Sequence, residues 1–365
     1  MRIWTGRAGS GKTTAILQEI AALCAQGEGR QVLLVPELNS HRMERRLAAA
    51  TGNHGARTAE VLTFSRLADR VFSEVGGLAQ QMLTPAGQLL TLQEAARRVQ
   101  GGLSVWNGLA DKPELLKEAL RLIDECKTCA IAPEALFAAS EECEDAALAG
   151  KLGDLAQLLT AYERLCDESL PDPRDRLTHL RDRLGECHVL DGAAVYLDGF
   201  LGFTPQELAV IDAMLAAGVQ LAAAITCDMA YPEIFVTGCK TVKTLTRMAK
   251  RHNKTAQQID LGASKIVRPA GLAAVESESL LPVRTPHEDA HGVHLYAAAS
   301  PFDECEHAAA YIRRKVRDEG ARYRDFVVAA RDIEPYSAFL AMAMARYDVP
   351  VFLAEKPDLL SRPPM

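Results

Sequence analysis

The sequence lacks an excess of positive charge. Its 365 residues include 41 Lys and Arg against 48 Asp and Glu, which gives a net charge of −7. This balance excludes a strongly basic nucleic-acid coat protein. It still permits a local basic groove, because affinity for phosphate depends on where the cations lie. With 48% hydrophobic and 24% charged residues, the composition is that of a folded protein, and the length predicts two or three domains.

A repeated cysteine spacing is also missing. The nine cysteines are an odd number without a pattern, which argues against a disulfide framework. Cys126 and Cys129 form the only close pair in the sequence and have no second pair at metal-ligand spacing, so we expect no metal site there. The N-terminus has no basic segment followed by an apolar stretch, so we expect no secretory signal and a cytoplasmic location.

Uninterrupted apolar runs long enough to span a membrane are absent as well. The one stretch that invites a membrane test, residues 209–227, contains Asp212 and Gln220. A central aspartate costs roughly 2.5 to 3.5 kcal/mol in a bilayer. Gly218 divides the stretch into a helix followed by a strand. The sequence therefore predicts buried core here and no membrane partner.

The order of the expected elements indicates an α/β protein. We expect strands at residues 2–5, 31–35 and 60–64, and helices at 12–26 and 41–50. This alternation predicts a parallel sheet with crossover helices. Only helical patterns occur over 79–188, and strands return at 194–197 and 221–226. The first domain is therefore expected over 1–78 and 189–251, with 79–188 as an all-helical insertion.

A second α/β unit is expected after a connection over residues 252–291. Its predicted strands lie at 293–297, 326–330 and 349–353, and its predicted helices at 302–319 and 335–347. Residues 292–365 are too short to close a second doubly wound domain, so we expect this unit to be truncated.

The strongest motif is GRAGSGKT at residues 6–13, a full match to G-x-x-x-x-G-K-[ST]. It follows an expected strand and opens an expected helix, which is the setting that a phosphate-binding loop needs. Backbone N–H groups and the helix N-terminus then face phosphate oxygens, Lys12 reaches the β- and γ-phosphates, and Thr13 binds Mg²⁺. The nucleotide-binding residues that we predict here are Gly6, Gly9, Ser10, Gly11, Lys12, Thr13 and Thr14.

A second magnesium ligand is expected at the end of the apolar run at residues 193–197. Asp198 follows that run directly, although a simple strand-end cap is the alternative. The next residue is Gly199, where a carboxylate that orients water is usual. Glycine can neither position water nor accept a proton, so the sequence predicts ATP and Mg²⁺ binding with weak hydrolysis.

Several strings carry a family resemblance. They are GRAGSGKTT at 6–14, VPE at 35–37, VLTFSRLA at 61–68, FSEVGG at 72–77, LDGFLGFTPQ at 197–206 and AARD at 329–332. With them the chain resembles, over nearly its whole length, the AddB family, the second subunits of bacterial AddAB helicase-nucleases and relatives of superfamily 1 helicases. Leu38 departs from the pattern, because Gln is expected after Pro36 and Glu37.

The resemblance implies a helicase-like P-loop fold with the start of a second RecA-like domain. It implies work with an AddA motor subunit, as a heterodimer, on single-stranded DNA and duplex ends in recombinational break repair. The family's nuclease domain and its cysteine-ligated iron-sulfur cluster are expected only in a missing C-terminal part. This fragment of a hydrolase complex is then expected to bind ATP without nuclease activity of its own.

The resemblance also suggests site residues outside the phosphate loop. Phe64, Ser65 and Arg66 correspond to a DNA-contacting loop, where Phe64 would stack on a base or else simply end a strand in the core. Arg331 corresponds to an arginine that reaches the γ-phosphate, or else pairs with Asp332. The basic segment from His41 to Arg46 is expected to be a solvated helix face.

Two other functions fit the motif. One is a free-standing P-loop kinase or phosphotransferase, with the helical block as a substrate lid. The other is a structural DNA-repair subunit whose nucleotide site is vestigial. Nucleotide titration distinguishes a vestigial site from a working one. DNA binding distinguishes the helicase-like protein from a kinase.

Overall fold

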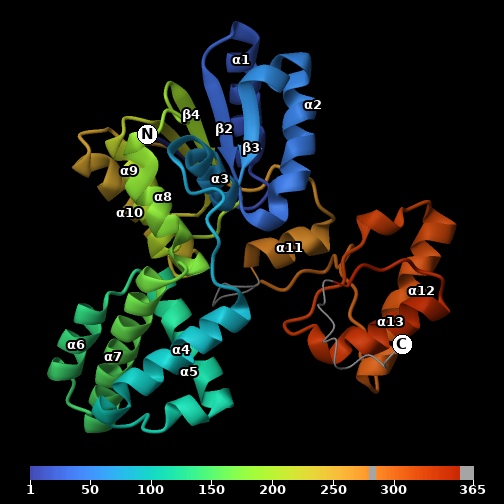
Figure 1. Ribbon diagram of the computed structural model, residues 1–365. Coiled ribbons are helices and arrows are strands. Elements are labelled where there is room, and N and C mark those ends of the chain that lie inside the picture. Colours follow the sequence, from blue (N-terminus) through green and yellow to red (C-terminus); the bar gives the residue numbers. More distant parts are fainter. Residues whose placement is uncertain (279–284, 354–365) are drawn as a thin grey trace. The chain divides into compact units, whose positions relative to one another are not determined.

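The computed structural model describes residues 1–278 and 285–353 (Figure 1). The chain divides into two compact units, the first spanning Met1–Val267 and the second beginning at Arg268. No helix in the described ranges is both long and apolar enough to cross a bilayer.

A six-stranded parallel sheet forms the centre of the first unit, in the order β3-β2-β4-β5-β1-β6. The strands are β1 (Arg2–Gly6), β2 (Arg30–Leu34), β3 (Ala59–Leu62), β4 (Ala193–Leu197), β5 (Gln220–Thr226) and β6 (Gln257–Asp260). The α/β prediction is confirmed. Because all strands are parallel, the loops after β1, β2, β4 and β5 emerge at one edge of the sheet.

Helices cover both faces of this sheet (Figure 1). One face packs against α1 (Lys12–Gln26) and α2 (Ser40–Thr58), and the other against α3 (Phe64–Val75), α8 (Arg176–Arg183), α9 (Pro205–Ala216) and α10 (Val236–Arg251). Successive strand residues alternate between the two cores, as Ile3 and Trp4 do in β1. Burial on both faces explains the continuous apolar runs in these strands.

An all-helical block lies between β3 and β4 in the chain. Its main helices are α4 (Pro85–Val99), α5 (Pro113–Thr128), α6 (Pro133–Glu142) and α7 (Ala146–Glu168). It has its own apolar core, in which Leu92, Ile123, Leu158 and Tyr162 are fully buried. Four helices around a separate core explain why the strand pattern disappears over this part of the sequence.

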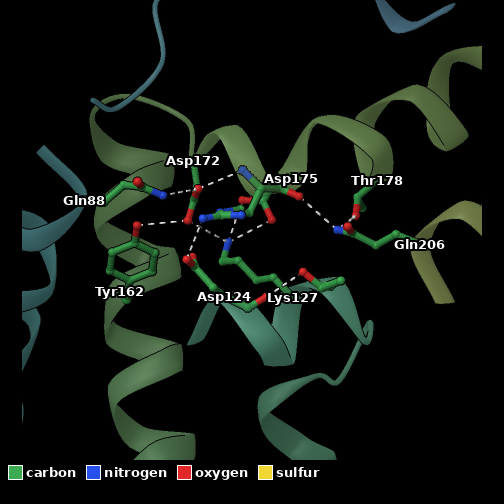
Figure 2. A network of polar contacts seen from close by, with 10 residues as sticks. Gln88, Asp124, Lys127, Tyr162, Asp172, Asp175, Thr178 and Gln206 are labelled. Atoms are coloured by element: carbon green, nitrogen blue, oxygen red, sulfur yellow. Dashed lines mark hydrogen bonds and ion pairs between the residues drawn. The ribbon is translucent and has the colours of Figure 1, made fainter. Parts of the chain in front are cut away.

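A buried polar network joins this block to the return segment before α8. Figure 2 shows Lys127 of α5 between Asp175 and Asp172. The Lys127 ammonium donates to both Asp175 oxygens, at 2.8 and 2.6 Å, and lies 3.7 Å from Asp172. Asp172 also accepts from the Tyr162 hydroxyl at 2.9 Å and from the Gln88 amide at 2.9 Å. The network therefore ties α4, α5 and α7 to one segment.

The same segment contacts the sheet body through α9. The side-chain amide of Gln206 donates to the Arg174 carbonyl oxygen at 2.9 Å and to the Thr178 hydroxyl at 3.3 Å (Figure 2). Gln206 lies in the first turn of α9, which begins seven residues after Asp198. Only a short stretch of chain thus separates the end of β4 from Gln206, where α9 contacts the segment that leads out of the helical block.

The second unit is mainly helical where it is described, with α11 (Ala270–Glu278), α12 (Pro301–Glu319) and α13 (Ser337–Arg346). The predicted helices are present. The three predicted strands at 293–297, 326–330 and 349–353 are wrong in the described ranges, because no backbone ladder joins these segments. A strand exists only where a neighbour pairs with it. Leu295, Val327 and Phe352 are accordingly at least 90% exposed, so the α/β character of this unit stays a prediction.

Candidate functional site

The phosphate loop lies between β1 and α1. Gly6, Gly9 and Gly11 have φ of 146°, 79° and 95°, which side-chain-bearing residues rarely adopt. A Cβ at Gly6 would lie only 2.6 Å from the Ser10 hydroxyl oxygen. Gly11 is the N-cap of α1 and has open space where its Cβ would be. The three glycines therefore allow a loop backbone that residues with side chains would adopt only with strain. At Gly6 a side chain would also collide with Ser10.

Lys12 is buried and held by neutral groups. Its ammonium donates to the carbonyl oxygens of Gly6 at 2.8 Å and Arg7 at 2.9 Å. Burial lowers the pKa of Lys12, and the nearby Asp198 carboxylate partly opposes this shift. No ion pair to Lys12 occurs in the described part of the chain. A cation held only by carbonyls keeps its charge available for an anion.

The Thr13 hydroxyl and the Asp198 carboxylate meet at the same edge. The hydroxyl donates to a carboxylate oxygen at 3.1 Å. Burial raises the pKa of Asp198, against the hydrogen bond from Thr13 and the positive charge of Arg46. Hydroxyl and carboxylate oxygens are ligands that Mg²⁺ prefers. Ser10 adds a buried hydroxyl without a hydrogen-bond partner in the described residues. These groups fit a magnesium-bound nucleotide.

Gly199 follows Asp198 in a left-handed conformation, with φ of 82°. A Cβ there would lie 3.3 Å from the Asn39 side-chain nitrogen and 3.5 Å from Pro36. The backbone at this position therefore favours glycine over any residue with a carboxylate. Glu207, the next carboxylate along the chain, accepts from the Thr204 backbone N–H at 2.8 Å in a capping box and is committed to the start of α9.

The predicted DNA-contacting residues lie in the first turn of α3. Phe64 is buried and packs edge-on against Phe200, with ring centroids 5.7 Å apart. It therefore belongs to the core as the first residue of α3, and not as the end of a strand, because β3 ends at Leu62. Ser65 and Arg66 are exposed, and Arg66 pairs with Glu44. Among the apolar side chains that protrude from the loops after these strands are Leu38, 99% exposed, and Leu201, 80% exposed.

Two predicted residues remain, Thr14 and Arg331. Thr14 is exposed in the first turn of α1. Arg331 belongs to the second unit, where it is exposed and makes no ion pair with Asp332 in the described ranges. Its predicted role at the γ-phosphate stays a prediction.

Three contacts of the site could not be foreseen from the motifs. Arg7, inside the phosphate loop, forms an ion pair with Asp228, which follows β5. The segment after β6 lies against the same loop, since Arg7 donates its N–H to Gly262 and Lys265 donates its N–H to Gly9, each at 3.0 Å. Of these residues, only Asp228 has a signal in the sequence, because it follows an apolar strand as Asp198 does.

The comparisons with known proteins agree on one family. The family described as ADDB, N-terminal, matches residues 3–276. Curated B subunits of ATP-dependent helicase/deoxyribonucleases are 31% identical in Acetivibrio thermocellus and 34% in Desulforudis audaxviator, in each case over all of this chain. The Moorella thermoacetica protein of the same name is 32% identical over 97% of it. The chain spans about a third of these relatives, 32–33% of their length.

Proposed function

Because this chain belongs to the AddB family through its match to the N-terminal region over residues 3–276, we propose that it is the ATP- and DNA-binding, helicase-like region of one subunit of a helicase-nuclease. The contact that supports this most directly is the hydrogen bond between Thr13 and Asp198 beside the buried Lys12. It brings a phosphate-binding cation and two magnesium ligands together at one sheet edge.

In this proposal the nucleotide acts mainly as a ligand. Lys12 contacts the β- and γ-phosphates, and Thr13 and Asp198 hold the magnesium ion, which would neutralise phosphate charge when bound. Gly199 supports weak turnover, because its φ of 82° disfavours the carboxylate that would orient water. ATP binding then sets the shape of this edge without rapid hydrolysis.

The printed names of the relatives extend the proposal to partners and substrate. A protein named as one of an enzyme's subunits has at least one partner, which in the AddB resemblance is the AddA motor. We place single-stranded DNA at the exposed first turn of α3, with Ser65 and Arg66 near its phosphates. The chain spans a third of its relatives, so nuclease chemistry and any iron-sulfur cluster are proposed for the rest of their length. The complex would work in the cytoplasm in double-strand-break repair.

A titration of Mg-ATP by calorimetry tests the nucleotide site. Lys12→Ala should weaken binding by at least about 1.4 kcal/mol, which is tenfold. Lys243→Ala, which removes the same charge from the exposed side of α10, should bind as the wild type does. With single-stranded DNA present, the wild type should turn over ATP well below the roughly 10 s⁻¹ of a typical enzyme. Equal affinity of the wild type and Lys12→Ala would contradict the proposal.

A further inference from the structure

The side chain of Arg7 is fixed by residues that follow β5. Its Nε donates to an Asp228 carboxylate oxygen at 2.7 Å, and its guanidinium carbon lies 4.9 Å from the centre of the Tyr231 ring. Asp228 is itself held by its own turn, since its other carboxylate oxygen accepts from the Ala230 N–H at 2.9 Å. The guanidinium therefore has a defined position beside the phosphate loop.

The backbone of the same residue takes part in the loop. The Arg7 N–H donates to the Gly262 carbonyl oxygen at 3.0 Å. Its carbonyl oxygen accepts from the Lys12 ammonium at 2.9 Å and from the Ser10 N–H at 3.2 Å. One residue thus joins the turn after β5, the segment after β6 and the phosphate-binding lysine.

The surroundings favour a strong ion pair here. The side chains of Arg7 and Asp228 are only 22% and 23% exposed, so solvent screens their attraction less than it does at an open surface. Although partial burial opposes its charge, the hydrogen bond from Arg7 lowers the pKa of Asp228. The hydrogen bond with Asp228 raises the pKa of Arg7. Both groups therefore stay charged across the pH range in which proteins are usually folded and active.

We propose that Arg7 is a positioning residue of the nucleotide site, which anchors the phosphate loop to β5 through Asp228. This inference rests on the proposed nucleotide function. When phosphate arrives, Lys12 exchanges carbonyl oxygens for phosphate oxygens, while the Arg7–Asp228 pair holds the loop in its binding shape. A loop that is already ordered loses less conformational freedom on binding, which raises affinity.

A matched control lies at the other end of the same strand. Arg2 forms an ion pair with Glu19, with one contact of 2.7 Å, and its guanidinium carbon lies 5.4 Å from the Trp4 ring. Arg2 therefore has the same kinds of partner as Arg7 but lies away from the phosphate loop. Replacing either arginine with alanine would remove an ion pair and lower the general stability to a similar extent. Only Arg7→Ala should also affect the phosphate loop.

The experiment compares wild type, Arg7→Ala, Asp228→Asn and Arg2→Ala. Mg-ADP affinity is measured by calorimetry, and amide exchange over residues 7–14 is measured without nucleotide. Arg7→Ala and Asp228→Asn should each bind about tenfold more weakly and exchange these amides about tenfold faster, while Arg2→Ala matches the wild type in both. The charge-exchanged pair R7D with D228R should recover part of the affinity.

The outcomes separate the two proposals. If the wild type binds no nucleotide, the proposed function fails together with this inference. If the wild type binds and Arg7→Ala binds equally, the positioning role alone is overturned. If Arg7→Ala fails to fold, Asp228→Asn decides, since it keeps the size of the side chain and removes only its charge. Faster exchange and weaker binding in Arg2→Ala would also overturn the role.

Discussion

Two requirements on the Asp198 side chain oppose each other, burial and ionisation. It must be buried to meet Thr13 at the end of β4, and that burial raises its pKa. Magnesium, however, binds only the ionised carboxylate. The proton and the metal therefore compete at a higher pH than they would at an exposed aspartate.

This competition predicts a pH dependence. The gain in ATP affinity that Mg²⁺ provides should be full above the raised pKa of Asp198 and lost as the pH falls through it. Calorimetry with Mg²⁺ and with EDTA, at a series of falling pH values over which the protein stays folded, measures that gain. Asp198→Asn is the control, because ATP itself also takes up protons in this range. A wild-type profile that coincides with that of Asp198→Asn would contradict the prediction.

At the scale of elements, the buried network of Figure 2 sets how firmly the helical block is attached. The Lys127 and Asp172 side chains are 4% and 0% exposed. Burial opposes the charge of Lys127, but Asp175 and Asp172 outweigh it and raise its pKa. Burial likewise raises the pKa of the neighbouring Glu163, against the charge of Lys127. The lysine is thus the cation on which several acidic groups depend.

Removal of this cation should be costly. Lys127→Ala removes the cation beside the buried Asp172 and the partly buried Asp175, and should lower the free energy of unfolding by about 3 to 5 kcal/mol. Lys117→Ala breaks an exposed pair with Glu114 on the same helix and should change it by no more than about 1 kcal/mol. Urea denaturation compares the two variants. A small effect of Lys127→Ala would mean that water enters the network readily.

Elements with local signals are the ones that could be predicted. The start of α4 has a local signal in Thr84 followed by Pro85, and the Thr84 hydroxyl accepts from the Gly87 N–H. The end of α1 has another in Gly27, whose φ is 72°. The network around Lys127 could not be predicted, because its members come from α4, α5, α7 and the segment before α8 and share no spacing. Strands in the second unit failed for a related reason, since pairing depends on a neighbour and not on the segment itself.

At the scale of the site, the same distinction holds. The phosphate loop and Asp198 are local motifs next to strands, so their positions at the edge of the sheet could be predicted from the sequence, while their roles toward nucleotide and magnesium stay predictions. Phe64 was ambiguous because an aromatic residue near the end of a strand fits a core and a base equally well. The structure buries its ring against Phe200, and a role of this residue toward DNA stays a prediction. The Arg7–Asp228 pair joins residues 221 positions apart, which no pattern in the sequence connects.

At the scale of the whole molecule, the question is whether the second unit reads the nucleotide. The phosphate loop and its partners belong to Met1–Val267, whereas Arg331 belongs to the unit after it. A guanidinium at the γ-phosphate would favour ATP over ADP. Arg331→Ala should then lower the ratio of ATP to ADP affinity and leave ADP affinity nearly unchanged. Arg324→Ala, another exposed arginine of that unit, is the control, and an unchanged ratio in Arg331→Ala would exclude the role.

The segment after β6 has a mechanical consequence. Its two hydrogen bonds with the phosphate loop, from Arg7 to Gly262 and from Lys265 to Gly9, lie side by side along the chain just before it leaves the first unit at Val267. Tension on the chain beyond Val267 would reach Lys265 and Gly262 before it reaches β6, because both residues lie between β6 and Val267. Force on the chain that leaves the first unit would therefore act on the phosphate loop through these two hydrogen bonds.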